Sequence, residues 1–127
     1  MIVGCPVIRS RRFKMRFDVM PVATEKQILE VEKAANQVWH NYYKDIYSGE
    51  QIDYMLEKYQ SRDALKKQMA DKYIYYMLLS DNNFAGYLCF KHFPDHVLIS
   101  RLYIKPEYRR QGLARRSISL FENISRN

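Results

Sequence analysis

The sequence predicts one α/β domain of the α+β layered kind, in which helices cover a mostly antiparallel sheet. Its length of 127 residues is that of a single domain. Hydrophobic residues make up 47% of the chain and charged residues 28%, which is ordinary for a soluble globular protein. The pattern along the chain is a strand, then helices, then three strands, then a helix, and this order favours helices packed on an antiparallel sheet.

The first part of the chain is predicted to be an extension followed by a strand. Residues 1–14 show no hydrophobic period and contain a basic cluster at residues 9–12, so we interpret them as a basic N-terminal extension and residues 15–127 as the folded domain. Met15 is a second candidate for the natural start. Residues 17–22 alternate in hydrophobicity around Pro21, a pattern typical of a short strand that ends near a proline.

Three helices should follow this strand. Thr24 and Gln27 have the spacing of a capping box, so the first helix is expected to begin after Thr24. An apolar stripe continues at helical spacing as far as Trp39 and Tyr42. We expect these two residues to pack in the core, and contact with a ligand is the alternative. The apolar spacing over residues 52–59 predicts a second, short helix, and Ser61 is suited to cap a third.

Three further strands and a final helix complete the predicted fold. Residues 73–79 and 84–90 are rich in strand-forming residues and flank the turn signal at residues 81–83, so we expect a hairpin. Residues 97–104 form a third run with few charges, closed by Pro106. An apolar stripe from residue 113 to residue 124 then predicts a helix.

Charge and cysteine content restrict the class of protein. The net charge is +7, and residues 101–127 carry seven basic and two acidic side chains, which indicates an anionic partner. Cys5 and Cys89 are far apart and lack metal-ligand spacing, so we expect a reduced, cytoplasmic protein without a metal site. No apolar run approaches the roughly 18 residues that a membrane span requires, so no membrane association is expected.

The segment 102–115 carries the clearest chemical signal. It is predicted to run from a buried strand through a turn into a helix, whose N-terminus presents free N–H groups that bind phosphate. Gly112 lacks a Cβ, which allows a pyrophosphate to approach the backbone closely. Arg109, Arg110 and Arg115 supply forked donors suited to phosphate oxygens.

This segment resembles the acyl-CoA signature of the GNAT superfamily of N-acetyltransferases, R/Q-x-x-G-x-G/A, in the form Arg109-Arg110-Gln111-Gly112-Leu113-Ala114. The resemblance covers roughly residues 15–127, since residues 85–88 resemble the family's third strand and residues 39–59 its first helical pair. It implies acetyl-CoA as cosubstrate and direct attack of a primary amine, from a small molecule or a peptide, on the acetyl thioester.

The resemblance also implies residue roles. The strand pairs through its backbone with the pantetheine arm, and the amides of the loop hold the pyrophosphate. The cofactor-binding residues implied in this way are Leu102, Tyr103, Ile104, Arg109, Arg110, Gln111, Gly112, Leu113, Ala114 and Arg115. The family normally continues with further strands and a helix that close the cleft and often supply a tyrosine acid. This sequence stops before them, so we expect the N-terminal portion of the fold and assign no leaving-group acid.

Side chains for proton transfer are less well defined. Tyr103 lies on the right strand and is a candidate catalytic residue, although packing would suit it equally. Glu107 lies near the cofactor loop, where a helix N-terminus also favours an acidic residue. His92 and His96 bracket a turn, and a catalytic role for them is a weaker hypothesis.

The acceptor amine is predicted from a group of acidic residues. Asp45, Glu50 and Asp53 occur where the family's relatives bind acceptors, and a cationic acceptor such as a polyamine would suit three carboxylates.

Two other classes stay open at this point. One is a non-catalytic module of the same family that binds acyl-CoA or a protein partner. The other is a nucleic-acid binder, although no known nucleic-acid motif is visible. Its phosphate contacts would come from the basic N-terminal segment and from the arginines beside Tyr108, which are Arg109, Arg110, Arg115 and Arg116. A sheet edge left open by the missing strands is also compatible with a homodimer.

Overall fold

The computed structural model describes residues 8–9, 16–109 and 112–125. The elements follow one another as β1 (Ile8–Arg9), β2 (Phe17–Pro21), α1 (Glu25–Tyr43), α2 (Gly49–Gln60), α3 (Arg62–Ala70), β3 (Ile74–Ser80), β4 (Asn83–His92), β5 (Val97–Ile104), the 3-10 helix η1 (Pro106–Tyr108) and α4 (Leu113–Ser125). This order is the predicted one, and the α+β fold class is confirmed. The additions are the two-residue strand β1 and the single turn η1.

The described strands form one antiparallel sheet in the order β1-β2-β3-β4-β5. Two residues of the expected N-terminal extension belong to it, because Ile8 pairs with Val19 and Arg9 pairs with Asp18. The other residues of that extension lie outside the described part of the chain. The strands β2 to β5 are consecutive neighbours, so β5 ends the sheet in the direction away from β2.

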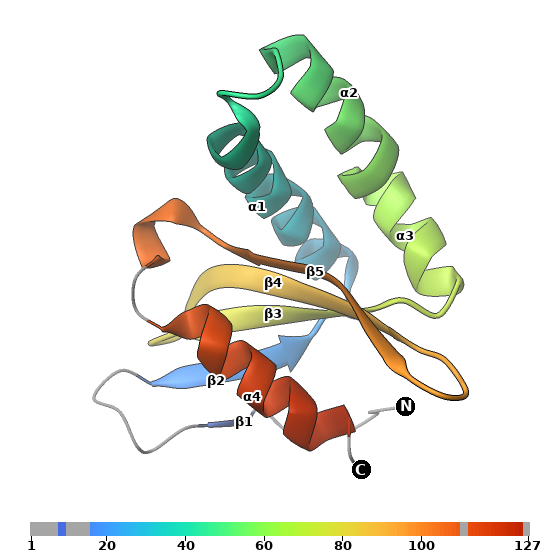
Figure 1. Ribbon diagram of the computed structural model, residues 1–127, viewed down its shortest axis with the longest axis vertical. Coiled ribbons are helices and arrows are strands. Elements are labelled where there is room, and N and C mark those ends of the chain that lie inside the picture. Colours follow the sequence, from blue (N-terminus) through green and yellow to red (C-terminus); the bar gives the residue numbers. More distant parts are fainter. Residues whose placement is uncertain (1–7, 10–15, 110–111, 126–127) are drawn as a thin grey trace.

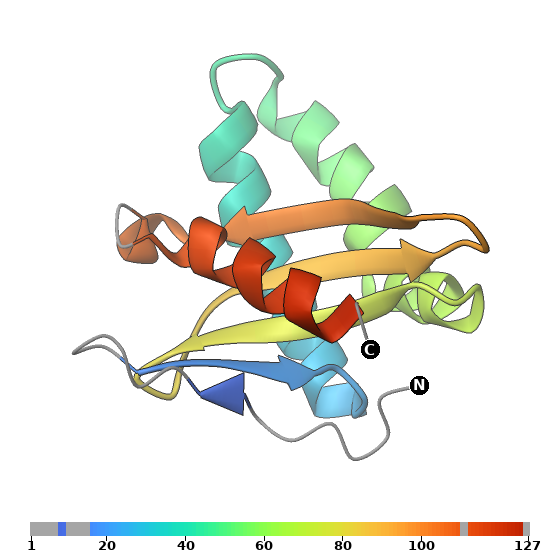
Figure 2. The same cartoon turned by 60° about the horizontal axis from the view of Figure 1, so that its bottom comes forward.

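Helices cover both faces of the sheet (Figures 1 and 2). The helices α1, α2 and α3 share one face, where Val31, Val38, Leu56 and Leu65 are buried against side chains of β3 and β4. The helix α4 lies across the other face, where Leu113 and Phe121 pack on residues of β2, β3 and β4. None of the helices described is long and apolar enough to cross a membrane.

Local sequence signals explain where the elements begin. The capping box forms as predicted: the Thr24 side chain accepts a hydrogen bond from the Gln27 backbone N–H, and the Gln27 side chain accepts one from the Thr24 backbone. The Ser61 side chain caps α3 by accepting a hydrogen bond from the Ala64 backbone N–H. Asp81 and Asn82 both have positive φ, the conformation that a two-residue hairpin turn of type I′ requires. These short-range signals therefore set the predicted helix starts and the β3–β4 turn.

The expected burial of the last α1 residues is correct for Trp39 and wrong for Tyr42. Trp39 is 6% exposed and belongs to the core between α1 and the sheet. Tyr42, in the last turn of α1, is 46% exposed, although its ring contacts the Tyr103 ring and the Arg109 guanidinium. Helical spacing identifies a face, whereas the length of the surface that covers it is a tertiary property.

Gly86 allows the close approach of β4 to β5. A Cβ built on Gly86 would lie 2.2 Å from the carbonyl oxygen of Tyr103 and 3.0 Å from the Cα of Ile104. Both are backbone atoms, so the strands would have to separate to accept a side chain. We therefore expect Gly86→Ala to lower the free energy of unfolding by about 1–3 kcal/mol, as other overpacking substitutions do.

Urea unfolding followed by tryptophan fluorescence measures this change, with Gly49→Ala as the matched control. A Cβ at Gly49 meets nothing within 4 Å at the start of α2. The free energy of unfolding of Gly49→Ala should therefore stay the same or rise by up to about 1 kcal/mol. Equal stability of the two variants would contradict the close approach.

Candidate functional site

The outer edge of β5 presents backbone groups that no described strand uses. The N–H of Lys105 donates to the carbonyl of Ala85 at 2.8 Å, so Lys105 is bonded to β4. Residues of an antiparallel pair alternate in direction, and therefore the N–H and C=O groups of Leu102 and Ile104 point away from β4. The Nε of Arg109 contacts the Ile104 carbonyl at 3.3 Å on that outer side, in agreement with this direction.

The N-terminus of α4 lies beside the end of β5. Gly112 has φ of +71°, a left-handed conformation that favours glycine, and its carbonyl accepts the first helical bond, from Arg116. The N–H groups of Leu113, Ala114 and Arg115 precede that bond, so they have no partner within the helix. These N–H groups lie at the positive end of the helix dipole, where an anion is stabilised.

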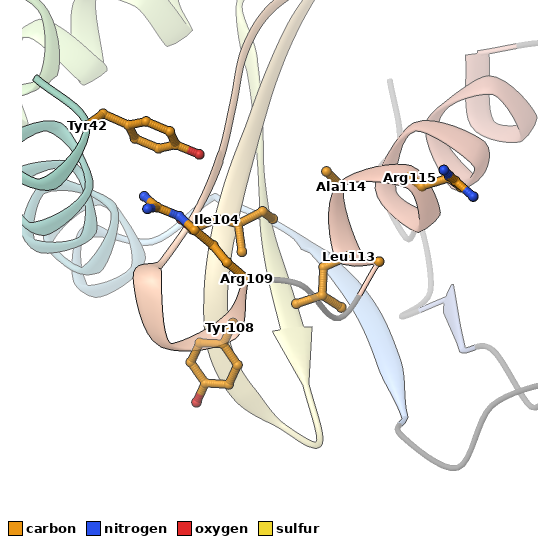
Figure 3. Close-up of a pocket in the computed structure, with 8 residues that line it drawn as sticks. Tyr42, Ile104, Tyr108, Arg109, Leu113, Ala114 and Arg115 are labelled. Carbon is orange, nitrogen blue, oxygen red and sulfur yellow. The ribbon is translucent and has the colours of Figure 1, made fainter.

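A cavity of about 370 Å³ joins these two features (Figure 3). It is bounded by the end of β5, the turn η1, the first turn of α4 and the end of α1. The lining residues are Tyr42, Ile104, Tyr108, Arg109, Gly112, Leu113, Ala114 and Arg115. Gly112, Ala114 and Arg115 are exposed, so the helix start is open to a ligand.

Arg109 fastens the loop to α1. Its Nη1 donates to Asn41 Oδ1 at 2.6 Å, and its guanidinium carbon lies 4.1 Å from the centre of the Tyr42 ring. Figure 3 shows the Arg109 side chain pointing toward Tyr42, whereas Arg115 points away from it. The Gln37 side chain donates to Glu107 at 2.9 Å, which adds a second link between α1 and η1. Arg109 therefore holds η1 against α1 at one wall of the cavity. Of the three nitrogens of its guanidinium, the buried Nη2 has no hydrogen bond to the described residues.

A second cavity, of about 260 Å³, lies on the α1 side of β5. Its walls come from α1, α2, the loop between these helices and β5. The lining residues are Trp39, Tyr43, Tyr47, Met55, Tyr59 and Arg101. A β-bulge lies next to Arg101. Cys89 pairs with Arg101 and Phe90 pairs with Ile99, so Ser100 is an extra residue in β5.

Tyr103 contacts one residue of each cavity, Tyr42 of the first and Trp39 of the second. Its ring centroid lies within 6 Å of those of Trp39, Tyr42 and Tyr87, so the side chain is packed among aromatic rings of α1 and β4. Burial raises the pKa of Tyr103 above its ordinary value, and the hydrogen bond to Tyr43 raises it further. The phenol therefore keeps its proton at neutral pH, and it suits a hydrogen-bond donor better than a base.

The other residues singled out in the sequence lie away from the two cavities or outside the described chain. His92 packs on Phe90, and His96 stacks on Phe93 at the far end of the β4–β5 hairpin. The structure does not describe Arg110 and Gln111. Among the acidic residues of the predicted acceptor site, Asp53 pairs with His40 at 2.8 Å, and none of Asp45, Glu50 and Asp53 lines either cavity.

Comparison with known proteins identifies the family. Residues 29–127 match the acetyltransferase (GNAT) family, and the chain belongs to that family. No curated protein sequence gives a significant match. The resemblance seen in the sequence is therefore confirmed at the level of the family.

Solved structures agree on the fold. A PaiA N-acetyltransferase from Thermoplasma acidophilum, solved with coenzyme A, is similar with a TM-score of 0.73 at 19% identity, over 85% of this chain and 70% of that protein. A GCN5-related N-acetyltransferase from Rhodopseudomonas palustris is similar with a TM-score of 0.66 at 17% identity, over 84% of this chain and 63% of that protein. An aminoglycoside acetyltransferase from an uncultured soil sample gives 0.56 at 16% identity, over 85% and 70%. At these identities the likeness concerns the fold, and this chain spans about two thirds of the proteins it resembles.

Two features of the site were not predicted from the sequence. One is the contribution of Tyr42 and Tyr108 to the first cavity. The other is the aromatic cavity around Arg101. A signal for Tyr42 existed, because it stands at the end of the apolar stripe of α1.

Proposed function

We propose that this protein is an N-acetyltransferase that uses acetyl-CoA as cosubstrate and a primary amine as acceptor. One observation carries the proposal: the N–H groups at the start of α4, which have no partner among the described residues, and the open edge of β5 meet at a single cavity. The pyrophosphate fits the first feature and the amide-bearing pantetheine arm fits the second. Family membership and the coenzyme A bound by the Thermoplasma acidophilum protein support this assignment.

In this proposal the pyrophosphate binds the backbone N–H groups of Leu113, Ala114 and Arg115. The Arg115 guanidinium adds charge from an exposed position, and Arg109 lines the same cavity. Gly112 keeps the approach to these amides open, since a Cβ there would meet nothing within 4 Å and the space is left to the ligand. The predicted roles of Arg110 and Gln111 stay predictions.

The pantetheine arm would extend along the outer edge of β5, with hydrogen bonds to the backbone of Ile104 and Leu102. Strand residues rise by about 3.3 Å each, so an arm that starts at Ile104 reaches the level of Arg101 after roughly 10 Å. The acetyl thioester would then lie near the bulge at Ser100. The Leu102 N–H points outward at this place and is our candidate donor to the oxygen that gains charge during transfer.

Acetyl transfer requires a base for the acceptor amine. An alkyl ammonium with a pKa near 10 must lose its proton before it attacks. Within the described residues, no carboxylate or histidine lines either cavity. This observation favours a second candidate function, in which the protein binds acyl-CoA without acetyl transfer.

The nucleic-acid and homodimer alternatives find less support. Arg109 is fastened to α1, and the Arg116 guanidinium lies 4.9 Å from the centre of the Phe17 ring, so these two cations do not form an open basic surface with Arg115. A homodimer joined through β5 would use the same backbone groups that we assign to the pantetheine arm.

Calorimetric titration with coenzyme A and with acetyl-CoA tests the cosubstrate. We expect dissociation constants of roughly 1 µM to 1 mM, the range in which enzymes bind their substrates. Release of free thiol from acetyl-CoA in the presence of a panel of amines then tests the transfer. Binding with thiol release supports the acetyltransferase, and binding without release for any amine supports the second candidate. A folded protein that binds neither compound would overturn both.

A further inference from the structure

The aromatic cavity beside β5 carries one formal charge, and that charge is positive. Trp39, Tyr43, Tyr47 and Tyr59 supply four rings, Met55 supplies a thioether, and Arg101 supplies a guanidinium. Most ligand pockets combine apolar walls with a few polar groups that fix orientation. Here Arg101 is the group with the strongest orienting power.

Arg101 has no acidic partner in the described part of the chain. It is half-buried, and its Nη1 donates to the Ser100 hydroxyl at 2.8 Å. No described carboxylate forms an ion pair with it, and the nearby ionisable groups are phenols and the Cys89 thiol. Burial raises the pKa of Tyr103 and raises that of Cys89 to about 11, and the positive charge of Arg101 acts in the opposite direction on both groups. The cavity therefore has a positive potential that nothing in its walls neutralises.

The position of the cavity relates it to the reaction. This step rests on the proposed function, which brings the thioester to the level of Ser100 and Arg101 on the edge of β5. The cavity opens on the α1 side of that strand, two residues from Tyr103. With the thioester at that level, a molecule held in the cavity would have its amine beside the same segment of β5.

We propose that this cavity binds the acceptor and that the acceptor is a primary amine that also carries a carboxylate, in the manner of an amino acid with an aromatic or apolar side chain. The guanidinium of Arg101 pairs with the carboxylate through two hydrogen bonds. The rings of Trp39 and Tyr59 cover the side chain. About 260 Å³ is below the usual range for drug-sized ligands, so a small acceptor fits.

The transfer that follows is balanced. A bond forms between the amine nitrogen and the acetyl carbon, and the carbon–sulfur bond of the thioester breaks. The ammonium first releases one proton to solvent, the neutral amine gives up a second as it forms the amide, and the departing thiolate takes up one. The carboxylate stays bound to Arg101 throughout, so the product is an N-acetylated amino acid.

The same charge disfavours the cationic acceptor that the acidic residues suggested. A polyamine would place ammonium groups close to Arg101 without a carboxylate to compensate. Asp53 faces His40 on another surface, so it does not reverse the sign of the potential in this cavity.

Fluorescence of Trp39 provides a direct test without coenzyme A, because it is the single tryptophan of the chain and lies in the cavity wall. The full chain is titrated with phenylalanine, with phenethylamine, which lacks the carboxylate, and with spermidine. We expect phenylalanine to bind at least about tenfold more tightly than phenethylamine, since a charged hydrogen-bonded pair accounts for that factor or more. Equal affinity for the two compounds, or tighter binding of spermidine, would overturn the proposal.

Two variants separate this inference from the proposed function. Arg101→Gln should remove the preference for phenylalanine and leave coenzyme A affinity within about twofold, whereas Arg101→Lys should retain part of the preference. Arg115→Gln should do the reverse, weakening coenzyme A and leaving phenylalanine binding as it is. Coenzyme A binding without a carboxylate preference would refute the acceptor assignment alone. A carboxylate preference without coenzyme A binding would refute the proposed transfer and retain the cavity as an amino-acid site.

Discussion

Replacing Gly112 by aspartate should reduce coenzyme A affinity at least about 100-fold. The new carboxylate would stand where the pyrophosphate is expected, beside the N–H groups of Leu113 and Ala114. Two unit charges 4 Å apart repel by about 4 kcal/mol at the effective dielectric constant of a protein surface, which exceeds the stated loss. The carboxylate would also occupy the helix start as an internal anion and compete for its amides. Calorimetric titration with coenzyme A measures the change.

The matched control is Gly112→Asn. Asparagine and aspartate have the same shape and both tolerate the left-handed conformation that residue 112 adopts at φ of +71°. They differ in charge, so the difference between the two variants isolates electrostatics from backbone strain. We expect Gly112→Asn to reduce coenzyme A affinity less than about tenfold. If both variants lost affinity equally, backbone conformation and not anion binding would explain the need for glycine. If neither lost affinity, the pyrophosphate would have to bind elsewhere.

Replacing Gln60 by leucine should lower the free energy of unfolding by about 2–4 kcal/mol. Gln60 is 1% exposed, and its side chain connects the end of α2 to the sheet. Its Oε1 accepts from the Tyr87 hydroxyl at 2.7 Å, and its Nε2 donates to the Tyr75 hydroxyl at 3.2 Å. Leucine fills similar space but leaves the buried Tyr87 hydroxyl without its acceptor, which costs about 1–3 kcal/mol. The Tyr75 hydroxyl loses one hydrogen bond and keeps the other, to Gln68, which adds about 0.5–1.5 kcal/mol. Urea unfolding monitored by Trp39 fluorescence measures the effect.

A double-mutant cycle gives the control for this network. In the Gln60→Leu background, Tyr87→Phe removes the orphaned hydroxyl, so part of the lost stability should return. In the wild-type background the same tyrosine substitution should destabilise the protein, since it leaves Gln60 Oε1 without its donor. Additive effects of the two changes would show that the side chains are not coupled. Tyr75 keeps its hydrogen bond to Gln68 in all of these variants, so the cycle isolates the hydrogen bond between Gln60 and Tyr87.

The sequence by itself determined the order of elements, their approximate bounds and the family. These depend on short-range signals: the Thr24 to Gln27 capping box, the turn at Asp81 and Asn82, and apolar spacing along each segment. Such signals act within a few residues, so they are legible without the fold. The segment from Leu102 to Arg115 was identified for the same reason, because the strand end, the glycine and the helix start follow one another in the chain.

Only the tertiary structure decided which side chains these elements bring together. Arg109 meets Asn41 across 68 positions of sequence, and Gln37 meets Glu107 across 70, so no local pattern could show that η1 is fastened to α1. The exposure of Tyr42 depends on which residues pack against the last turn of α1. The direction of Arg101 depends on a single extra residue at Ser100, which sets the face of the sheet that each later side chain meets. Contacts of this kind form when separate segments pack, and their energies come from burial and charge that exist only in the folded chain.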